Sequence, residues 1–240
     1  MQRYIVTMFA NDSFFDNNLH IITPTKAIAR SFKTPHHSLE TLAKTRVNQQ
    51  GWIVASSLLT RRYLQNTVRE VISTKDVKGT AEAFLSTIKE LFHSGIDLSK
   101  LQQQPSVRLQ QLASLAIIYQ QKLRTRGYLD RSELFWQGTK NVTKRQSYLF
   151  YGYFSPTRDE LAFIDAVAGD GSVIVLPQVE VAAFNFFVRY QNTLNFLQDR
   201  GWQLITRGTK KVKDNDFNLG KKLQKSFLNA NFLPSGAKLY

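Results

Sequence analysis

Short apolar runs alternate with segments of helical periodicity along most of the chain. Four of these runs are predicted to be strands, at about residues 19–23, 148–151, 173–176 and 203–206. The third run, Val173 to Leu176, is apolar at every position, which is typical of a strand buried on both faces of a parallel sheet. Because helical segments follow these runs, the pattern predicts an α/β fold with one mainly parallel sheet.

The middle of the chain differs because it is helical throughout. An apolar stripe from Ala81 to Phe92 stops at Gly95, which has the position of a left-handed helix cap. A second long helix is expected from about Val107 to Arg126, and Asp130 to Glu133 resembles a capping box that begins a third. We therefore expect residues of about 75–140 to form an all-helical insertion in the α/β fold.

Further helices are expected on either side of this insertion. Apolar positions from Leu39 to Val47 share one helix face, and a β-like start at Trp52 leads into a helix at about Leu58 to Ile72. Ser155 and Pro156 have the types expected at N-cap and N1 of a later helix, and Tyr190 to Asp199 resembles another.

The predicted domain organisation follows from these segments. Residues 1–74 and 141–207 are expected to form a discontinuous α/β domain that contains the insertion. Residues 208–240 are rich in lysine and polar, and we interpret them as a basic linker or the start of another domain.

Composition restricts the class of protein. The chain has 240 residues, 42% of them hydrophobic, which is enough for a sizeable core in one or two domains. No stretch reaches the roughly 18 to 20 uncharged apolar residues of a membrane span, and the N-terminus lacks a signal-peptide cleavage pattern, so a cytoplasmic location and no membrane partner are expected. Because there are no cysteines, disulfides, thiolate metal sites and a cysteine nucleophile are excluded.

Charge is strongly positive and unevenly distributed. The formal net charge is +14, which favours a polyanionic partner such as nucleic acid over a merely solvated surface. Residues 1–74 carry nine bases and four acids, 121–145 seven and two, and 201–240 eight and two, whereas 146–200 carry three bases and six acids. The excess of bases therefore belongs to particular regions.

Catalytic patterns are weak or absent. A phosphate-binding loop G-x-x-x-x-G-K-[ST] does not occur, and the segment before residue 19 has no glycine. Asp159 and Glu160 fit the acidic first turn of a helix better than a metal site. Asp214 and Asp216 lie in a polar segment, and the adjacent His36 and His37 cannot share one face as metal ligands. We therefore expect no metal and no cofactor.

Several short segments carry a family resemblance. TPTKAIA at residues 23–29 is similar to motif Ia of superfamily 1 helicases, and HHSLETLA to the segment that follows it. IYQQKLRTRGYLDRSELF at 118–135 resembles part of their inserted helical subdomain. YLFYGYFSPTRDELAFIDAV at 148–167 resembles the Walker B region of the RecB, AddB and RecC group of repair helicase–nucleases, with Tyr151 in place of the aspartate. The resemblance implies a P-loop-NTPase-like, helicase 1A-type sheet with a 1B-like insertion and lost nucleotide-binding motifs.

The resemblance also indicates candidate binding residues. At motif Ia, a helix N-terminus after a parallel strand offers amides, hydroxyls and cations to phosphate, although an ordinary βα turn would look the same. Tyr151 and Tyr153 are candidates for base stacking, with core packing as the alternative. The expected nucleic-acid-binding residues are Thr23, Thr25, Lys26, Arg30, Arg61 and Arg62.

Two classes of function remain open. The first is a catalytically inactive, helicase-like domain that binds DNA, preferably single-stranded, as the N-terminal part of a repair or recombination nuclease. Its partners would be a helicase or nuclease subunit or further domains of a parent exonuclease. The second is a self-contained α/β enzyme acting on a phosphorylated or anionic small molecule, for which the basic surface would serve the substrate.

Overall fold

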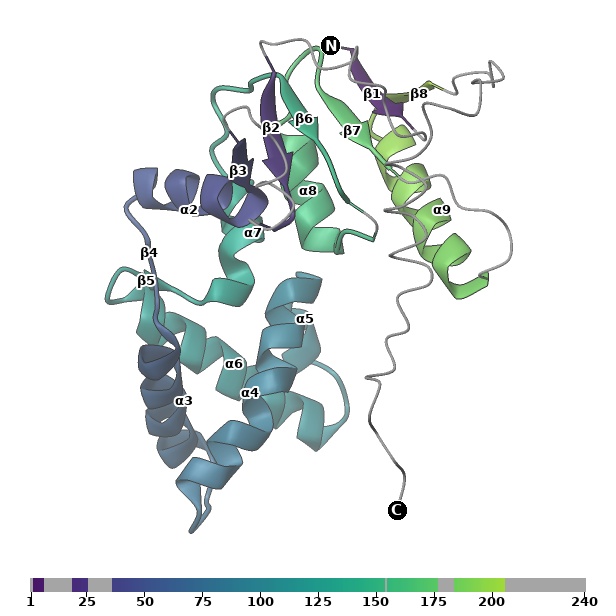
Figure 1. Ribbon diagram of the computed structural model, residues 1–240. Coiled ribbons are helices and arrows are strands. Elements are labelled where there is room, and N and C mark those ends of the chain that lie inside the picture. Colours follow the sequence, from purple (N-terminus) through teal and green to yellow (C-terminus); the bar gives the residue numbers. More distant parts are fainter. Residues whose placement is uncertain (1, 7–18, 26–35, 154, 177–183, 206–240) are drawn as a thin grey trace, which may run out of the picture.

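A computed structural model describes residues 2–6, 19–25, 36–153, 155–176 and 184–205. Within these residues the chain forms a sheet body and a helical body (Figure 1). The helices are α2 (Leu39–Gln49), α3 (Ser57–Val71), α4 (Val77–Ser94), α5 (Leu98–Gln102), α6 (Val107–Arg124), the 3-10 helix η2 (Arg131–Glu133), α7 (Leu134–Gly138), α8 (Arg158–Val167) and α9 (Phe184–Gln198). The strands are β1 (Arg3–Val6), β2 (His20–Thr23), β3 (His36–Ser38), β4 (Ile53–Val54), β5 (Tyr128–Leu129), β6 (Tyr148–Phe150), β7 (Val173–Val175) and β8 (Trp202–Ile205).

Six strands form one sheet in the order β3-β2-β6-β7-β1-β8, and every pairing is parallel. The predicted α/β fold with a parallel sheet is confirmed, and all four predicted strands belong to it. Two of its strands were not predicted. The β1 strand lies between β7 and β8, with Tyr4 opposite both Val173 and Gln203. The β3 strand, which contains His36 and His37, pairs with β2 at the sheet edge.

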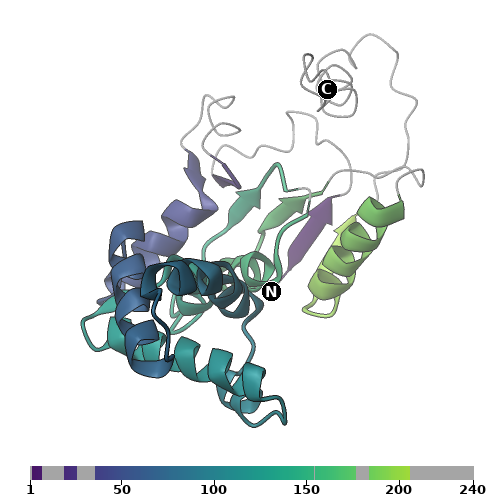
Figure 2. The same ribbon diagram turned by 90° about the horizontal axis from the view of Figure 1, so that it is seen from below.

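One face of the sheet packs on helices. The largest buried cluster joins sheet residues such as Ile22, Phe150 and Ile174 to residues of α2, α7, α8 and α9. Seen from below, α2 and α9 lie toward opposite ends of the strand array (Figure 2). A second cluster, on the strands alone, contains Val6, Ile21, Leu149, Val173 and Val175. The strands β6 and β7 are thus buried on both faces, as the apolar run of β7 predicted.

The helical body has a core of its own. Buried residues of α3, α4 and α6, among them Leu64, Ile88 and Tyr119, form a cluster separate from the one under the sheet. The β-like segment before α3 forms β4, which pairs with β5 in a separate two-stranded parallel sheet. Gly95 ends α4 in the left-handed conformation, as predicted, with φ of 66°. The division of the chain into domains and an insertion stays a prediction.

One predicted helix start is corrected by the structure, and a second is confirmed in part. The N-cap of α8 is Thr157, not Ser155, because the backbone amide of Thr157 donates to Glu160 Oε2 at 2.8 Å in a capping box. At η2 only half of the expected box is present. Asp130 accepts from the Ser132 amide at 2.8 Å, while Glu133 instead accepts from Arg124 at 2.6 Å.

None of the helices in the described part of the chain combines the length and apolar character needed to cross a bilayer.

Candidate nucleic-acid interface

The order of the strands creates one divergent point in the sheet. From β2 the chain moves outward to the edge strand β3, whereas from β6 it moves the other way, to β7. Loops that leave neighbouring strands in opposite directions open a crevice at the carboxyl ends of those strands, where open α/β sheets bind ligands. The two loops here begin at Pro24 and at Tyr151, and the Tyr151 amide donates to the Ile22 carbonyl at 2.9 Å.

The loop after β2 is shaped by Thr23. Its side chain is fully buried, and its hydroxyl donates to the Thr25 carbonyl at 2.9 Å. The Thr23 hydroxyl is therefore engaged inside the turn, while Thr25 is exposed. Lys26 and Arg30, the two predicted cations of this motif, lie outside the described residues.

The loop after β6 places its two tyrosines differently. Tyr153 is only 2% exposed, and its ring packs edge-on against Phe150 in the core. Burial raises the pKa of Tyr153 well above its ordinary value. Of the two alternatives for Tyr153, core packing is the one that its burial favours. Tyr151 is half-buried, and stacking of a base on it stays a prediction.

A groove of about 340 Å³ begins beside Pro24 and runs between the sheet body and the helical body. We call it the junction groove. Its lining includes Leu39, Phe135 and the charged side chains of Glu40, Lys89, His93, Arg131 and Glu160. These residues come from α2, α4, η2, α7 and α8, so the groove lies where several elements meet next to the divergent point of the sheet.

The cations of the junction groove differ in their partners. Arg131 and Lys44 both bind Glu40, at 2.8 Å each. Burial alone would raise the pKa of Glu40, but Lys44 and Arg131 outweigh it and hold that pKa below its ordinary value. Lys89 is half-buried, and no partner of its ammonium group is found within the described residues. Lys89 is therefore the cation best placed to bind an incoming anion.

His93 is held by a buried carboxylate. Its Nδ1 lies 2.8 Å from Asp159 Oδ2, and the Thr157 hydroxyl donates to the other carboxylate oxygen at 2.5 Å. The hydrogen bond to Asp159 raises the pKa of His93 against the opposing effect of burial. Burial would raise the pKa of Asp159, but the hydrogen bonds from His93 and Thr157 hold it below its ordinary value. The His93 side chain is about half exposed, so its free edge belongs to the groove.

The predicted acidic pair of α8 has two separate tasks. Glu160 caps the helix, as expected, whereas Asp159 is 1% exposed and bound to His93. Within the described ranges, no three His, Asp or Glu side chains come close enough together to hold a metal ion. Asp214 and Asp216 lie outside these ranges.

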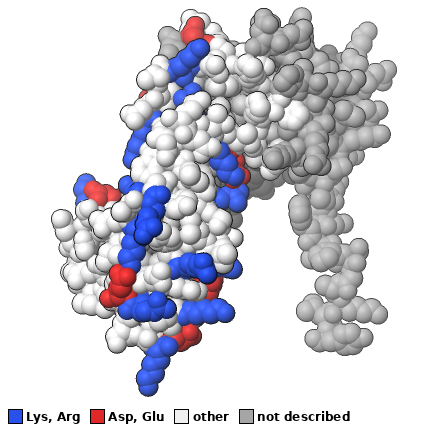
Figure 3. Space-filling view, turned by 90° about the vertical axis from the view of Figure 1, so that its left-hand side faces the viewer, with Lys and Arg blue, Asp and Glu red and all other residues white. Residues whose placement is uncertain are grey.

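The predicted basic residues of α3 lie away from this groove. Arg61 and Arg62 are exposed, and Arg61 forms an ion pair with Glu82 at 3.2 Å. Figure 3 shows the side of the molecule on which α2 and α3 lie, and Lys and Arg outnumber Asp and Glu on it. Arg61 and Arg62 therefore belong to an outer face that carries both signs of charge, and neither lines the junction groove beside Pro24.

Apart from Pro24 in the motif Ia-like turn, the sequence did not indicate that the lining residues of the groove form a site. Lys89 and His93 are four residues apart and therefore share one helix face, which is a signal visible in the sequence. Nothing local indicates that this face meets Arg131 and Asp159, which are 42 and 66 residues away from Lys89 and His93 respectively.

No family model matches the chain, and no curated protein sequence matches it.

Proposed function

We propose that the chain is a catalytically silent, helicase-like domain that binds single-stranded DNA as part of a repair or recombination nuclease of the AddB and RecB type. The observation that carries the proposal is the position of the junction groove, whose lining includes Pro24 of the motif Ia-like turn and Lys89, a cation without a partner among the described residues. The sugar–phosphate backbone of a single DNA strand that crosses the divergent point of the sheet would then enter this groove. The net charge of +14 supports a polyanionic ligand.

The absence of nucleotide chemistry in this proposal rests on two positions. The sequence has no phosphate-binding loop, and β6 leads into Tyr151 where the helicase pattern has a carboxylate for Mg²⁺. A partner helicase or nuclease subunit, or further domains of the parent protein, would supply catalysis.

The proposal is tested by fluorescence anisotropy with a labelled oligothymidylate of about 20 nucleotides, at pH 6.5 and several salt concentrations. We expect the logarithm of the affinity to fall with the logarithm of salt concentration by about 0.7 per phosphate contact. The double variant Lys89→Ala with Arg131→Ala should lose about tenfold in affinity, at roughly one factor of three to five per cation. The loss of affinity should be similar for oligonucleotides of every base sequence, because phosphate contacts carry no base information.

A matched control is the double variant Lys100→Ala with Arg108→Ala, which removes one exposed lysine and one exposed arginine from the helical body outside the groove. If both double variants bind as the parent does, the groove is not the interface. Removing residues after Gly208 separates the basic tail, and loss of all binding in that variant would assign the affinity to the tail alone. A variant with Lys26→Ala and Arg30→Ala tests the motif Ia cations in the same assay.

One observation favours the second class of function, an enzyme for an anionic small molecule. The Asp159–His93 pair in a groove of about 340 Å³ has the form of a carboxylate-oriented imidazole that could move a proton. Release of phosphate from a panel of phosphomonoesters, abolished by His93→Gln, would favour this function, and salt-dependent binding of DNA without such turnover favours the first.

A further inference from the structure

His93 joins three elements at the junction groove. It lies in the last turn of α4, its Nδ1 is bound to Asp159 of α8, and its carbonyl accepts the Trp136 Nε1 hydrogen of α7 at 2.9 Å. These contacts fix the imidazole in place, with one nitrogen on a buried carboxylate. The exposed remainder of the ring lines the groove.

The charges around this imidazole are closely balanced. Three cations lie at the groove or bind its acids. Four carboxylates line the groove or act on His93, and they come from α2, from α8 and from the N-cap of η2. The cations are Lys44, Lys89 and Arg131, and the carboxylates are Glu40, Asp130, Asp159 and Glu160. With neutral His93 the carboxylates are therefore in excess by one, and a proton on His93 removes the excess.

We propose that His93 is a protonation switch of the junction groove, so that binding of a DNA phosphate there is coupled to the uptake of a proton. The inference rests on the proposed function and adds a condition to it. A phosphate beside the imidazole favours the charged form, and by linkage the charged form favours the phosphate.

Asp159 sets the pH range of the switch. An unperturbed histidine titrates near 6.5, and the hydrogen bond to Asp159 raises the pKa of His93 above this value. Affinity for DNA is then highest below the pKa of His93 and falls as the pH rises through it. Because the group is about half exposed, the expected loss is modest, about fivefold for one charge at contact distance.

The experiment measures binding of the oligothymidylate by calorimetry and anisotropy between pH 6 and pH 9. Calorimetry in two buffers of different ionisation enthalpy reports the protons taken up on binding. We expect uptake of a fraction of one proton near the pKa of His93 in the parent protein. The variant His93→Gln should show neither this uptake nor the fivefold loss at high pH, whereas His37→Gln, which changes an exposed histidine of β3, should retain both.

Two further variants distinguish a switch from a merely structural histidine. His93→Arg keeps a cation at every pH, so its affinity should not fall between pH 6 and pH 9. Asp159→Asn removes the carboxylate that raises the pKa of His93, so the midpoint of the pH profile should move to lower pH. The titration of His93, followed by NMR in the absence of DNA, measures the same movement independently of binding.

The outcomes separate this inference from the proposed function. Absence of DNA binding at every pH overturns both. Salt-dependent binding that is weakened by Lys89→Ala with Arg131→Ala, but takes up no proton at His93, overturns the switch and leaves the proposed function standing. Equal pH profiles for the parent and His93→Gln also overturn the switch alone, and a pH dependence lost only in His93→Gln and His93→Arg supports it.

Discussion

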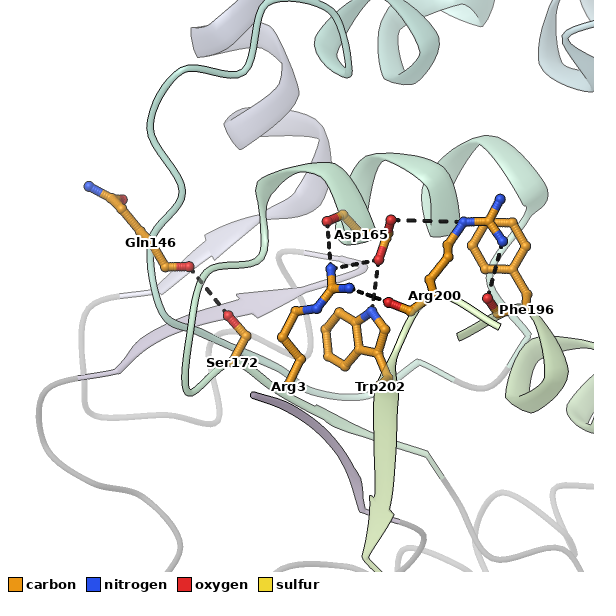
Figure 4. Close-up of polar contacts among 7 residues, drawn as sticks. All are labelled: Arg3, Gln146, Asp165, Ser172, Phe196, Arg200 and Trp202. Atoms are coloured by element: carbon orange, nitrogen blue, oxygen red, sulfur yellow. Dashed lines mark hydrogen bonds and ion pairs between the residues drawn. The ribbon is translucent and has the colours of Figure 1, made fainter. Parts of the chain in front are cut away.

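The helix α8 carries a partly or fully buried aspartate near each end, and the two have different kinds of partner. Asp159, in the first turn, binds the titratable imidazole of His93 at the junction groove. Asp165, in the last turn, binds the Arg3 guanidinium at 2.7 Å and accepts the Trp202 Nε1 hydrogen at 2.9 Å (Figure 4). One carboxylate therefore has a partner whose charge depends on pH, and the other has a partner that is always charged.

The permanent Arg3–Asp165 pair lies at the end of the sheet where the strands β1 and β8 begin. Arg3 also donates to the carbonyls of Asp165 and Arg200, and its guanidinium stacks 5.0 Å from the centre of the Trp202 ring. These contacts tie the first residues of β1 and β8 to α8 at the edge opposite the groove. The helix α8 thus combines a fixed anchor, the Asp165–Arg3 pair, with an adjustable contact, the Asp159–His93 pair. The difference arises from the partner, because only the charge of histidine changes near neutral pH.

The largest effect is expected when the fixed anchor is broken. Asp165→Ala leaves the nearly buried Arg3 without its counter-ion, and an unpaired buried charge costs about 3 kcal/mol of the free energy of unfolding. Urea denaturation measures the loss. Asp199→Ala, at an exposed position after α9, should change stability by less than about 0.5 kcal/mol, and an equal loss in both variants would contradict the anchor.

A smaller loss of stability is expected from a substitution at Gly95, which would displace Trp136, a residue that contacts the backbone of His93. A methyl group on Gly95 would come within 2.7 Å of the Trp136 ring, whose Nε1 binds the His93 carbonyl. Alanine also disfavours the left-handed conformation. Gly95→Ala should therefore lower the free energy of unfolding by about 2 kcal/mol. Gly127→Ala, also left-handed but with open space around it, should lose only about 1 kcal/mol in the same thermal denaturation. Equal losses would show that Trp136 yields without cost.

The adjustable contact itself should contribute least, and only over part of the pH range. The pKa of Asp159 is lowered by folding, so its contribution is present above the unfolded pKa of about 4 and is lost as the pH falls through the folded value. The pKa of His93 is raised, so its contribution is complete below about 6.5 and is lost as the pH rises through the folded value. Asp159→Asn should therefore cost about 1 kcal/mol at pH 6 and less at pH 9. A cost that does not change with pH would show that the imidazole keeps one charge state between pH 6 and pH 9.

No effect is expected from Mg-ATP. Both aspartates of α8 are bound by protein groups, and neither is free to hold Mg²⁺ for a nucleotide. Calorimetry with millimolar Mg-ATP, with and without single-stranded DNA, should show no saturable binding. Saturable heat in either titration would contradict the proposed loss of nucleotide chemistry.

The sequence predicts those parts of the fold whose signals are local. The runs at β2, β6 and β7 are apolar enough to identify as strands, and the stripe and glycine cap of α4 define that helix. The β3 strand, with the sequence HHS, has no apolar pattern and is a strand because β2 pairs with it. The β1 strand is short, and its pairing to β7 and β8 depends on residues about 170 to 200 positions away.

The candidate site was less predictable than the fold. Thr23 and the Pro24 turn were found because a strand and a turn signal are adjacent in the sequence. The groove depends on contacts between distant elements, such as His93 with Asp159, and single-sequence patterns do not report such contacts. Tyr153 shows a related ambiguity, because an aromatic residue after a strand has the same pattern whether its ring faces a ligand or the core. Its burial favours the core.

The position of β1 between β7 and β8 has a consequence for synthesis of the chain. During synthesis β1 finds its partners only after β7 and β8 have left the ribosome, since its register is fixed by Val173 and Gln203. At about 5 to 20 residues per second, β1 remains without a strand partner for roughly 10 to 30 s. During that time Ile5 and Val6, which are buried in the finished sheet, are available to chaperones, and the sheet closes last around its oldest strand.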